Sequence, residues 1–202
     1  MICEPAVFLD KDGTLVNDVP YNVDPSQISL APGAAALPRL VEAGYRLVVV
    51  SNQSGVARGY FDEQALNGVE QRLRELLEDL GAPLAGFYYC PHLPTGRVAQ
   101  FAVRCECRKP QPGLLLRAAK ELSLDLRRSW MIGDILDDVE AAHLAGCRAI
   151  LLLNGGETQW VVAARRAPDA VARDLAGAAT RILDESLLTG RRPAAVEVAA
   201  DA

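Results

Sequence analysis

An apolar run at residues 6–9 leads directly into an acidic segment, DKDGT, that begins at Asp10. The run is typical of a short buried strand. Side chains two positions apart on an extended backbone point to the same side, so Asp10 and Asp12 can act together. Such a pair suits a carboxylate nucleophile and a proton donor that share one Mg²⁺. The alternative is a surface turn, since Asp and Gly are common turn residues.

Polar side chains also follow two later apolar runs. Ser51 begins the segment SNQSG after residues 46–50, and Asp134 lies just beyond residues 130–132. A serine hydroxyl can donate a hydrogen bond to a phosphoryl oxygen, and small neighbouring residues let backbone N–H groups approach an anion. Asp134 can join Asp10 as a ligand, because Mg²⁺ prefers carboxylates, phosphate and water. A polar turn at Ser51 and a helix cap at Asp134 are the alternatives.

A basic pair, Arg108 and Lys109, precedes a predicted helix that begins near Pro112. Lysine offers a compact positive charge to a phosphate, and arginine binds one through its planar fork. A solvated surface pair is the alternative.

Three cysteines and one of the two histidines gather just before this pair. Cys90 and His92 are separated by one residue, as are Cys105 and Cys107. Four such ligands in two close pairs fit a closed tetrahedral Zn²⁺ site, whose role is structural because no coordination position stays open. Buried free thiols beside a surface histidine are the alternative.

The remaining candidates receive no chemical role. We interpret Asp137 and Asp138 as helix-capping groups or supports of the site. Cys3 and Cys147 read as ordinary small apolar residues, and His143 as a packing or solvent-facing residue.

The order of apolar runs and helical patterns predicts an α/β fold. The expected strands are 6–9, 46–50, 86–89, 130–132, 149–153 and 170–172, and the expected helices are 34–43, 62–80 with Asp62 as its cap, 114–122, 137–145 and 174–187. Strands that alternate with helices form a parallel sheet covered on both faces. Ligands of such sheets bind beyond the carboxyl ends of the strands, where the polar segments above lie.

The composition limits the classes of function. The chain has 202 residues, 50% of them hydrophobic and 23% charged, with a formal net charge of −5. This balance fits one globular core and disfavours nucleic acid and anionic membranes as partners. No run reaches the roughly 18 apolar residues of a membrane span, and no signal peptide is evident, so we expect a cytoplasmic location. Since no long apolar face suggests an obligate assembly, we expect a monomer. We expect one domain over residues 1–186, with its zinc loop at 90–107, and a flexible tail over 187–202.

Taken in order, these segments resemble the four motifs of the haloacid-dehalogenase (HAD)-like phosphatases, over about residues 6–155. The cysteine–histidine loop resembles the subgroup that acts on heptose bisphosphate or histidinol phosphate. The segment SNQSGVARG from Ser51 and the twelve residues between His92 and Cys105 favour the heptose branch. Ile135 departs from that branch, which often has lysine there. The resemblance implies a Rossmann-like sheet without a large cap domain.

The resemblance also implies roles. Asp10 would attack phosphorus and carry an aspartyl-phosphate, and Asp12 would protonate the leaving oxygen and then activate water, with a pKa raised by Asp10 and the substrate phosphate. Mg²⁺ would lie on the Asp10 carboxylate, the Asp12 carbonyl and Asp134, while Ser51 and Lys109 hold the phosphoryl oxygens. The residues expected to recognise the rest of the substrate are Arg108, Asp18, Val19, Pro20, Tyr21, Asn52, Gln53 and Ser54.

The implied function is Mg²⁺-dependent removal of the 7-phosphate of a heptose 1,7-bisphosphate in nucleotide-heptose synthesis. Histidinol phosphate or another small phosphorylated metabolite is the alternative substrate. A non-catalytic binding module that is stapled by zinc is the alternative from another class.

Overall fold

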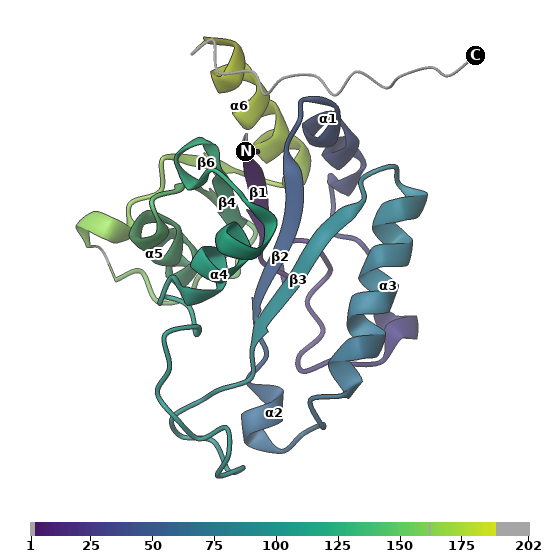
Figure 1. Ribbon diagram of the computed structural model, residues 1–202, viewed down its shortest axis with the longest axis vertical. Coiled ribbons are helices and arrows are strands. Elements are labelled where there is room, and N and C mark those ends of the chain that lie inside the picture. The colour runs from purple at the N-terminus through teal and green to yellow at the C-terminus, as the bar shows by residue number, and fades with distance from the viewer. Residues whose placement is uncertain (1–2, 162, 189–202) are drawn as a thin grey trace.

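In the computed structural model, which describes residues 3–161 and 163–188, the chain forms an α/β layered fold around one parallel sheet (Figure 1). The strand order is β3-β2-β1-β4-β5-β6. The strands are β1 (Ala6–Leu9), β2 (Arg46–Asn52), β3 (Leu84–Cys90), β4 (Trp130–Gly133), β5 (Arg148–Leu152) and β6 (Ala170–Ala172). The first, second and fourth strands are buried on both faces, which explains their continuous apolar runs.

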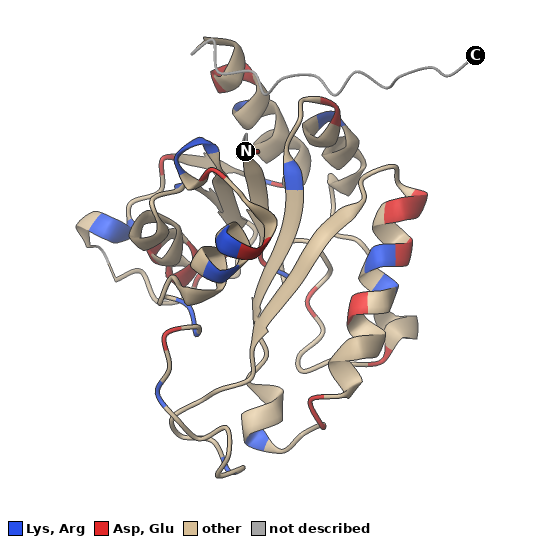
Figure 2. Ribbon diagram, in the orientation of Figure 1, with Lys and Arg blue, Asp and Glu red and all other residues tan. Residues whose placement is uncertain are grey.

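Helices cover both faces of the sheet, as the sequence predicts. The helices are α1 (Leu37–Glu42), α2 (Gly55–Arg58), α3 (Ala65–Asp79), α4 (Gly113–Leu122), α5 (Leu136–Ala145) and α6 (Leu175–Leu188). Buried side chains of α1, α3 and α6 pack with Val7, Leu9 and Val49 on one face, and those of α4 and α5 pack with Phe8 and Val48 on the other. Acidic and basic residues are interspersed along α3 (Figure 2), and Arg74 of this helix pairs with Glu70.

Several predicted boundaries shift in the structure. The predicted helix 34–43 starts as a 3-10 turn, Ala34–Ala36, before α1. The predicted helix 62–80 starts only at Ala65; Asp62 contributes its backbone carbonyl to the Ala65 N–H rather than a side-chain cap. The short helix α2 was not predicted, because four residues give no helical periodicity. Strand β5 starts and ends one residue before the predicted strand 149–153.

The longer extent of β2 and β3 matters for the site. Ser51 and Asn52 are the last residues of β2 and pair in parallel with Tyr89 and Cys90 at the end of β3. The loop after β1 is attached to the neighbouring strand as well, since the Asp10 N–H donates to the Ile132 carbonyl of β4 at 3.0 Å. The carboxyl ends of β3, β2, β1 and β4 therefore place Cys90, Ser51, Asp10 and Asp134 along one edge of the sheet.

Helix α6 continues through Leu188, and residues 189–202 lie outside the described part, so the predicted tail stays a prediction. Within residues 3–161 and 163–188, no helix combines the length and the apolar character that crossing a membrane requires.

Candidate active site and metal centre

Lys109 and Asp10 form the centre of the site. The Lys109 ammonium lies 2.5 Å from Asp10 Oδ1, 2.6 Å from Asp138 Oδ1 and 2.9 Å from the Val50 carbonyl, and its side chain is only 2% exposed. Burial opposes the charged form, but the two carboxylates outweigh it and raise the pKa of Lys109. The site therefore keeps a permanent cation beside the predicted nucleophile.

Asp12 is held by donors on both carboxylate oxygens. The Gln53 amide donates to Asp12 Oδ2 at 3.1 Å and also to Ser51 Oγ at 2.8 Å, while the buried Lys11 ammonium contacts Asp12 Oδ1. Burial raises the pKa of Asp12, and Asp10 adds to the rise, while Lys11 opposes it. The predicted direction is confirmed, but burial rather than a neighbouring charge is the main cause. Sequence reasoning missed Lys11, although a cation between two acidic residues is a readable signal.

Asp134 lies in the loop between β4 and α5, next to these groups. One oxygen from each of Asp10, Asp134 and Asp138 can lie within 4.8 Å of the others. Burial, and then the charges of Asp10 and Asp138, raise the pKa of Asp134 to about 7. Three buried carboxylates against one ammonium leave an excess of negative charge, and all of their donor atoms are oxygens. This donor set fits a hard divalent cation such as Mg²⁺.

Asp138 is a support rather than a free ligand. Its Oδ2 accepts from the Ile135 N–H at 3.3 Å, at the start of α5, and its Oδ1 pairs with Lys109. The predicted capping role of Asp138 is thus confirmed. Its ion pair with Lys109 was not predicted from the sequence. Asp137 instead pairs with Arg166, away from the site.

The predicted substrate-recognition residues fall into two groups. Asn52, Gln53 and Ser54 extend from β2 toward α2, beside Lys109; Asn52 Oδ1 accepts from the Lys109 N–H at 3.0 Å. Arg108 donates to the His92 carbonyl at 3.4 Å, which ties it to the cysteine–histidine loop.

The second group is the loop of residues 18–21. Asp18 lines a cavity of about 380 Å³ that Asp134 also lines. Val19 is half-buried and Pro20 is exposed. Tyr21 packs edge-to-face on Tyr60 at 4.8 Å between ring centroids. Among the described residues, no hydrogen bond or ion pair joins this loop to Lys109 or Asp10.

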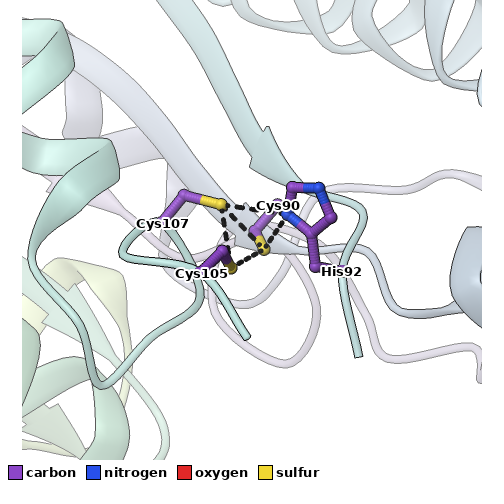
Figure 3. Close-up of side chains that lie close together, drawn as sticks. All are labelled: Cys90, His92, Cys105 and Cys107. Atoms are coloured by element: carbon purple, nitrogen blue, oxygen red, sulfur yellow. Dashed lines mark hydrogen bonds between the residues drawn. The ribbon is translucent and has the colours of Figure 1, made fainter. Parts of the chain in front are cut away.

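The predicted zinc ligands converge (Figure 3). The Cys107 sulfur lies 3.1 Å from that of Cys90, 3.2 Å from that of Cys105 and 3.3 Å from His92 Nδ1. These separations exceed the roughly 2.05 Å of a disulfide and approach the spacing between ligands of a tetrahedral ion. The hydrogen bond between the Cys107 and Cys90 sulfurs is the largest of the causes that lower the pKa of Cys107. Sulfur and imidazole donors in this arrangement fit Zn²⁺.

The other cysteines and histidine lie elsewhere. Cys147, interpreted as an ordinary small apolar residue, is buried, whereas Cys3, interpreted in the same way, is exposed. His143 links the Arg165 carbonyl and the Asp169 carboxylate at 2.8 and 2.9 Å, so its role is structural.

Known proteins are similar to this chain both in sequence and in three-dimensional structure. A model of HAD-hydrolase-like proteins matches residues 106–178. A Photorhabdus laumondii protein named D-glycero-beta-D-manno-heptose-1,7-bisphosphate 7-phosphatase is 45% identical over 154 residues, which cover 76% of this chain and 82% of that protein. This chain belongs to the HAD-like phosphatase family. The predicted family, and the prediction that the chain is an enzyme, are therefore confirmed.

Solved structures of HAD-like phosphatases have the same fold as this chain. A Mesorhizobium loti protein described as a HAD-like phosphatase is 36% identical, with a TM-score of 0.75 over 90% of this chain and 85% of that one. The D,D-heptose 1,7-bisphosphate phosphatase from B. bronchiseptica is 31% identical, with a TM-score of 0.72 over 90% of this chain and 99% of that one. That enzyme was solved in complex with magnesium and phosphate.

Proposed function

We propose that this HAD-like phosphatase removes the 7-phosphate of D-glycero-beta-D-manno-heptose 1,7-bisphosphate with the help of Mg²⁺. The names of its relatives support the substrate. The observation that carries the chemistry is the buried contact of 2.5 Å between Lys109 and Asp10, with Asp134 beside it. A binding module without catalysis has no need to bury three carboxylates around a lysine.

The reaction proceeds in two displacements at phosphorus. A carboxylate oxygen of Asp10 attacks, the bond between phosphorus and the sugar oxygen breaks, and Asp12 gives its proton to that oxygen. Asp12 then takes a proton from the water that attacks the aspartyl-phosphate, which releases phosphate and restores Asp10. Two easier steps replace one difficult one. Lys109 and Ser51 bind the equatorial oxygens, where negative charge accumulates.

The metal ligands follow from the donor sets. The Asp10 carboxylate, the Asp12 backbone carbonyl and Asp134 would hold Mg²⁺, which supplies positive charge to the phosphoryl oxygens. Cys90, His92, Cys105 and Cys107 would hold Zn²⁺ in a closed structural site. The zinc site anchors the loop between β3 and α4, which delivers Arg108 and Lys109 to the edge of the sheet.

The rest of the substrate lies against residues contributed by three segments. We propose that it contacts Arg108, the loop of residues 18–21, Gln53 and Ser54, while Asn52, whose amide bonds the Lys109 backbone, positions that lysine. Since one chain supplies every group named here, we propose that the enzyme acts as a monomer. We also propose that it acts in the cytoplasm.

A phosphate-release assay tests the function. Purified enzyme with Mg²⁺ is given heptose 1,7-bisphosphate, histidinol phosphate and an aryl phosphate, and Asp10→Asn is the matched control. We expect kcat/KM for the heptose substrate to exceed the others by about a hundredfold, or about 2.7 kcal/mol in transition-state binding. A lead for histidinol phosphate would contradict the substrate, and no release from any ester would contradict the chemistry.

A further inference from the structure

The segment from Asn154 to Glu157, which begins two residues after the end of β5, reaches both acidic loops. The Asn154 amide donates to the Gly13 carbonyl at 2.5 Å, just after Asp10 and Asp12. The Glu157 carboxylate accepts from the Leu136 N–H at 2.7 Å, at the first residue of α5 and two residues after Asp134. Side chains of this one segment therefore connect the loop after β1 with the loop after β4.

Gly156 stands between these two contacts and faces the Asp134 carboxylate. A Cβ atom at Gly156 would lie 2.0 Å from Asp134 Oδ2 and 2.7 Å from its Cγ. The backbone of Gly156 is outside the left-handed region, so only the space that the carboxylate occupies excludes a side chain there. At the neighbouring Gly155 the backbone is instead the constraint: its φ is +95°, and an added Cβ atom would have no atom within 4 Å.

A second glycine confines the same oxygen from the other loop. A Cβ atom at Gly13 would lie 2.3 Å from Asp134 Oδ2. Gly13, Asp134, Asn154 and Gly156 also line the cavity of about 380 Å³ next to the site. The carboxylate is thus confined between two backbones at the wall of a cavity. The Asn154 hydrogen bond joins these two backbones, and the Glu157 hydrogen bond joins the segment to the first residue of α5, just after Asp134.

We propose that residues 154–157 form a clamp that positions Asp134 for the divalent cation, with Asn154, Gly156 and Glu157 as positioning residues. The proposal rests on the magnesium site of the proposed function. A carboxylate that is already fixed in its bound orientation loses less conformational freedom when the cation arrives, and this raises the affinity. The clamp touches neither Asp10 nor Lys109 in any contact that the described residues show.

Calorimetric titration of the zinc-loaded protein with MgCl₂ tests the clamp without relying on activity. We expect Gly156→Ala to weaken Mg²⁺ binding at least tenfold, or about 1.4 kcal/mol. Gly177→Ala is the matched control, because a Cβ atom at Gly177 has no neighbour nearer than 3.5 Å, and it should bind Mg²⁺ within twofold of the unsubstituted chain. The melting temperature without Mg²⁺ and the zinc content check that each variant is folded.

A second variant keeps the proposal testable if Gly156→Ala does not fold. Asn154→Ala removes an exposed side chain and two hydrogen bonds, one donated to the Gly13 carbonyl and one accepted from the Gly156 N–H, and we expect it to weaken Mg²⁺ binding at least threefold with an unchanged melting temperature. Affinities within twofold of the unsubstituted chain for the folded variants would overturn the clamp alone. Absence of Mg²⁺ binding by the unsubstituted chain would instead overturn the magnesium site itself.

Discussion

The side-chain amide of Asn52 is joined to the main chain of Lys109 by two hydrogen bonds. Asn52 Oδ1 accepts from the Lys109 N–H at 3.0 Å, and Asn52 Nδ2 donates to the Lys109 carbonyl at 3.1 Å. Strand β2 thereby holds the backbone of the residue whose ammonium reaches Asp10. Asn52 was expected to contact substrate, but in the structure both of its polar groups face Lys109.

Asn52→Ala should therefore slow catalysis more than it weakens substrate binding. Loss of both hydrogen bonds frees the Lys109 backbone, and we expect kcat to fall about 10- to 100-fold, or roughly 1.4–2.7 kcal/mol, with little change in KM. Steady-state kinetics measure this, and Asn67→Ala on the exposed side of α3 serves as control. A large rise in KM at constant kcat would instead mean that Asn52 binds the sugar.

Asp12→Asn should abolish proton transfer while leaving the phosphate site intact. We expect kcat for the sugar phosphate to fall by about 10²–10⁴, with a much smaller change in KM, because general acid–base catalysis contributes about that factor. An aryl phosphate has a leaving group that needs no proton, so its first turnover should survive as a burst of phenolate. Asp24→Asn, at an exposed cap outside the site, is the control. Equal losses in binding and turnover would speak against a proton-transfer role.

The pKa of Asp134, raised to about 7 mainly by burial, predicts how stability depends on pH without Mg²⁺. Between the unfolded value of 3.8 and about 7, the folded state binds the extra proton, so this contribution to stability is lost as pH rises through 7. From pH 6 to pH 8 the free energy of unfolding should decrease by about 1.4 kcal/mol through this group.

Urea unfolding of the zinc-loaded, Mg²⁺-free protein at both pH values measures this change. Asp134→Asn should be more stable than the unsubstituted chain at pH 8, and the difference should shrink at pH 6. Adding Mg²⁺ should stabilise the unsubstituted chain and not the variant. If the two chains show parallel pH dependences, the burial of Asp134 is not their source.

The cysteine–histidine centre predicts a structural zinc. Cys105→Ser should lose the metal, lower the melting temperature by several degrees and expose the loop between β3 and α4 to proteases, because binding of a structural Zn²⁺ is coupled to folding. Zinc content by atomic absorption is the direct measurement. Cys3→Ser removes an exposed thiol outside the cluster and should retain full zinc. A Cys105→Ser protein with unaltered zinc and melting temperature would exclude this site.

Much of the site could be predicted from the sequence because its chemistry follows apolar runs. Asp10, Ser51 and Asp134 each follow a buried parallel strand, so the fold class alone brings them to one edge. The zinc ligands were identifiable from residue types and spacing, since few other functions need three cysteines and a histidine so close together.

What the sequence did not reveal is the set of contacts between segments far apart in the chain. The ion pair of Lys109 with Asp138 and the Asn52 bridge depend on the strand order, which no local pattern encodes. Gly156 shows the same limit: its backbone is outside the left-handed region, and only the position of the Asp134 carboxylate makes an added Cβ atom clash.

The central claim is that Asp10 is esterified by the substrate's phosphorus during turnover. Rapid acid quenching during turnover of Asp12→Asn, followed by borohydride reduction and peptide mass spectrometry, tests it, because borohydride reduces an acyl phosphate to an alcohol and leaves a free carboxylate unchanged. We expect the reduced product at Asp10 and not at Asp134 or Asp138. Turnover with an unreduced Asp10 would mean that water attacks the phosphate directly, which contradicts the mechanism.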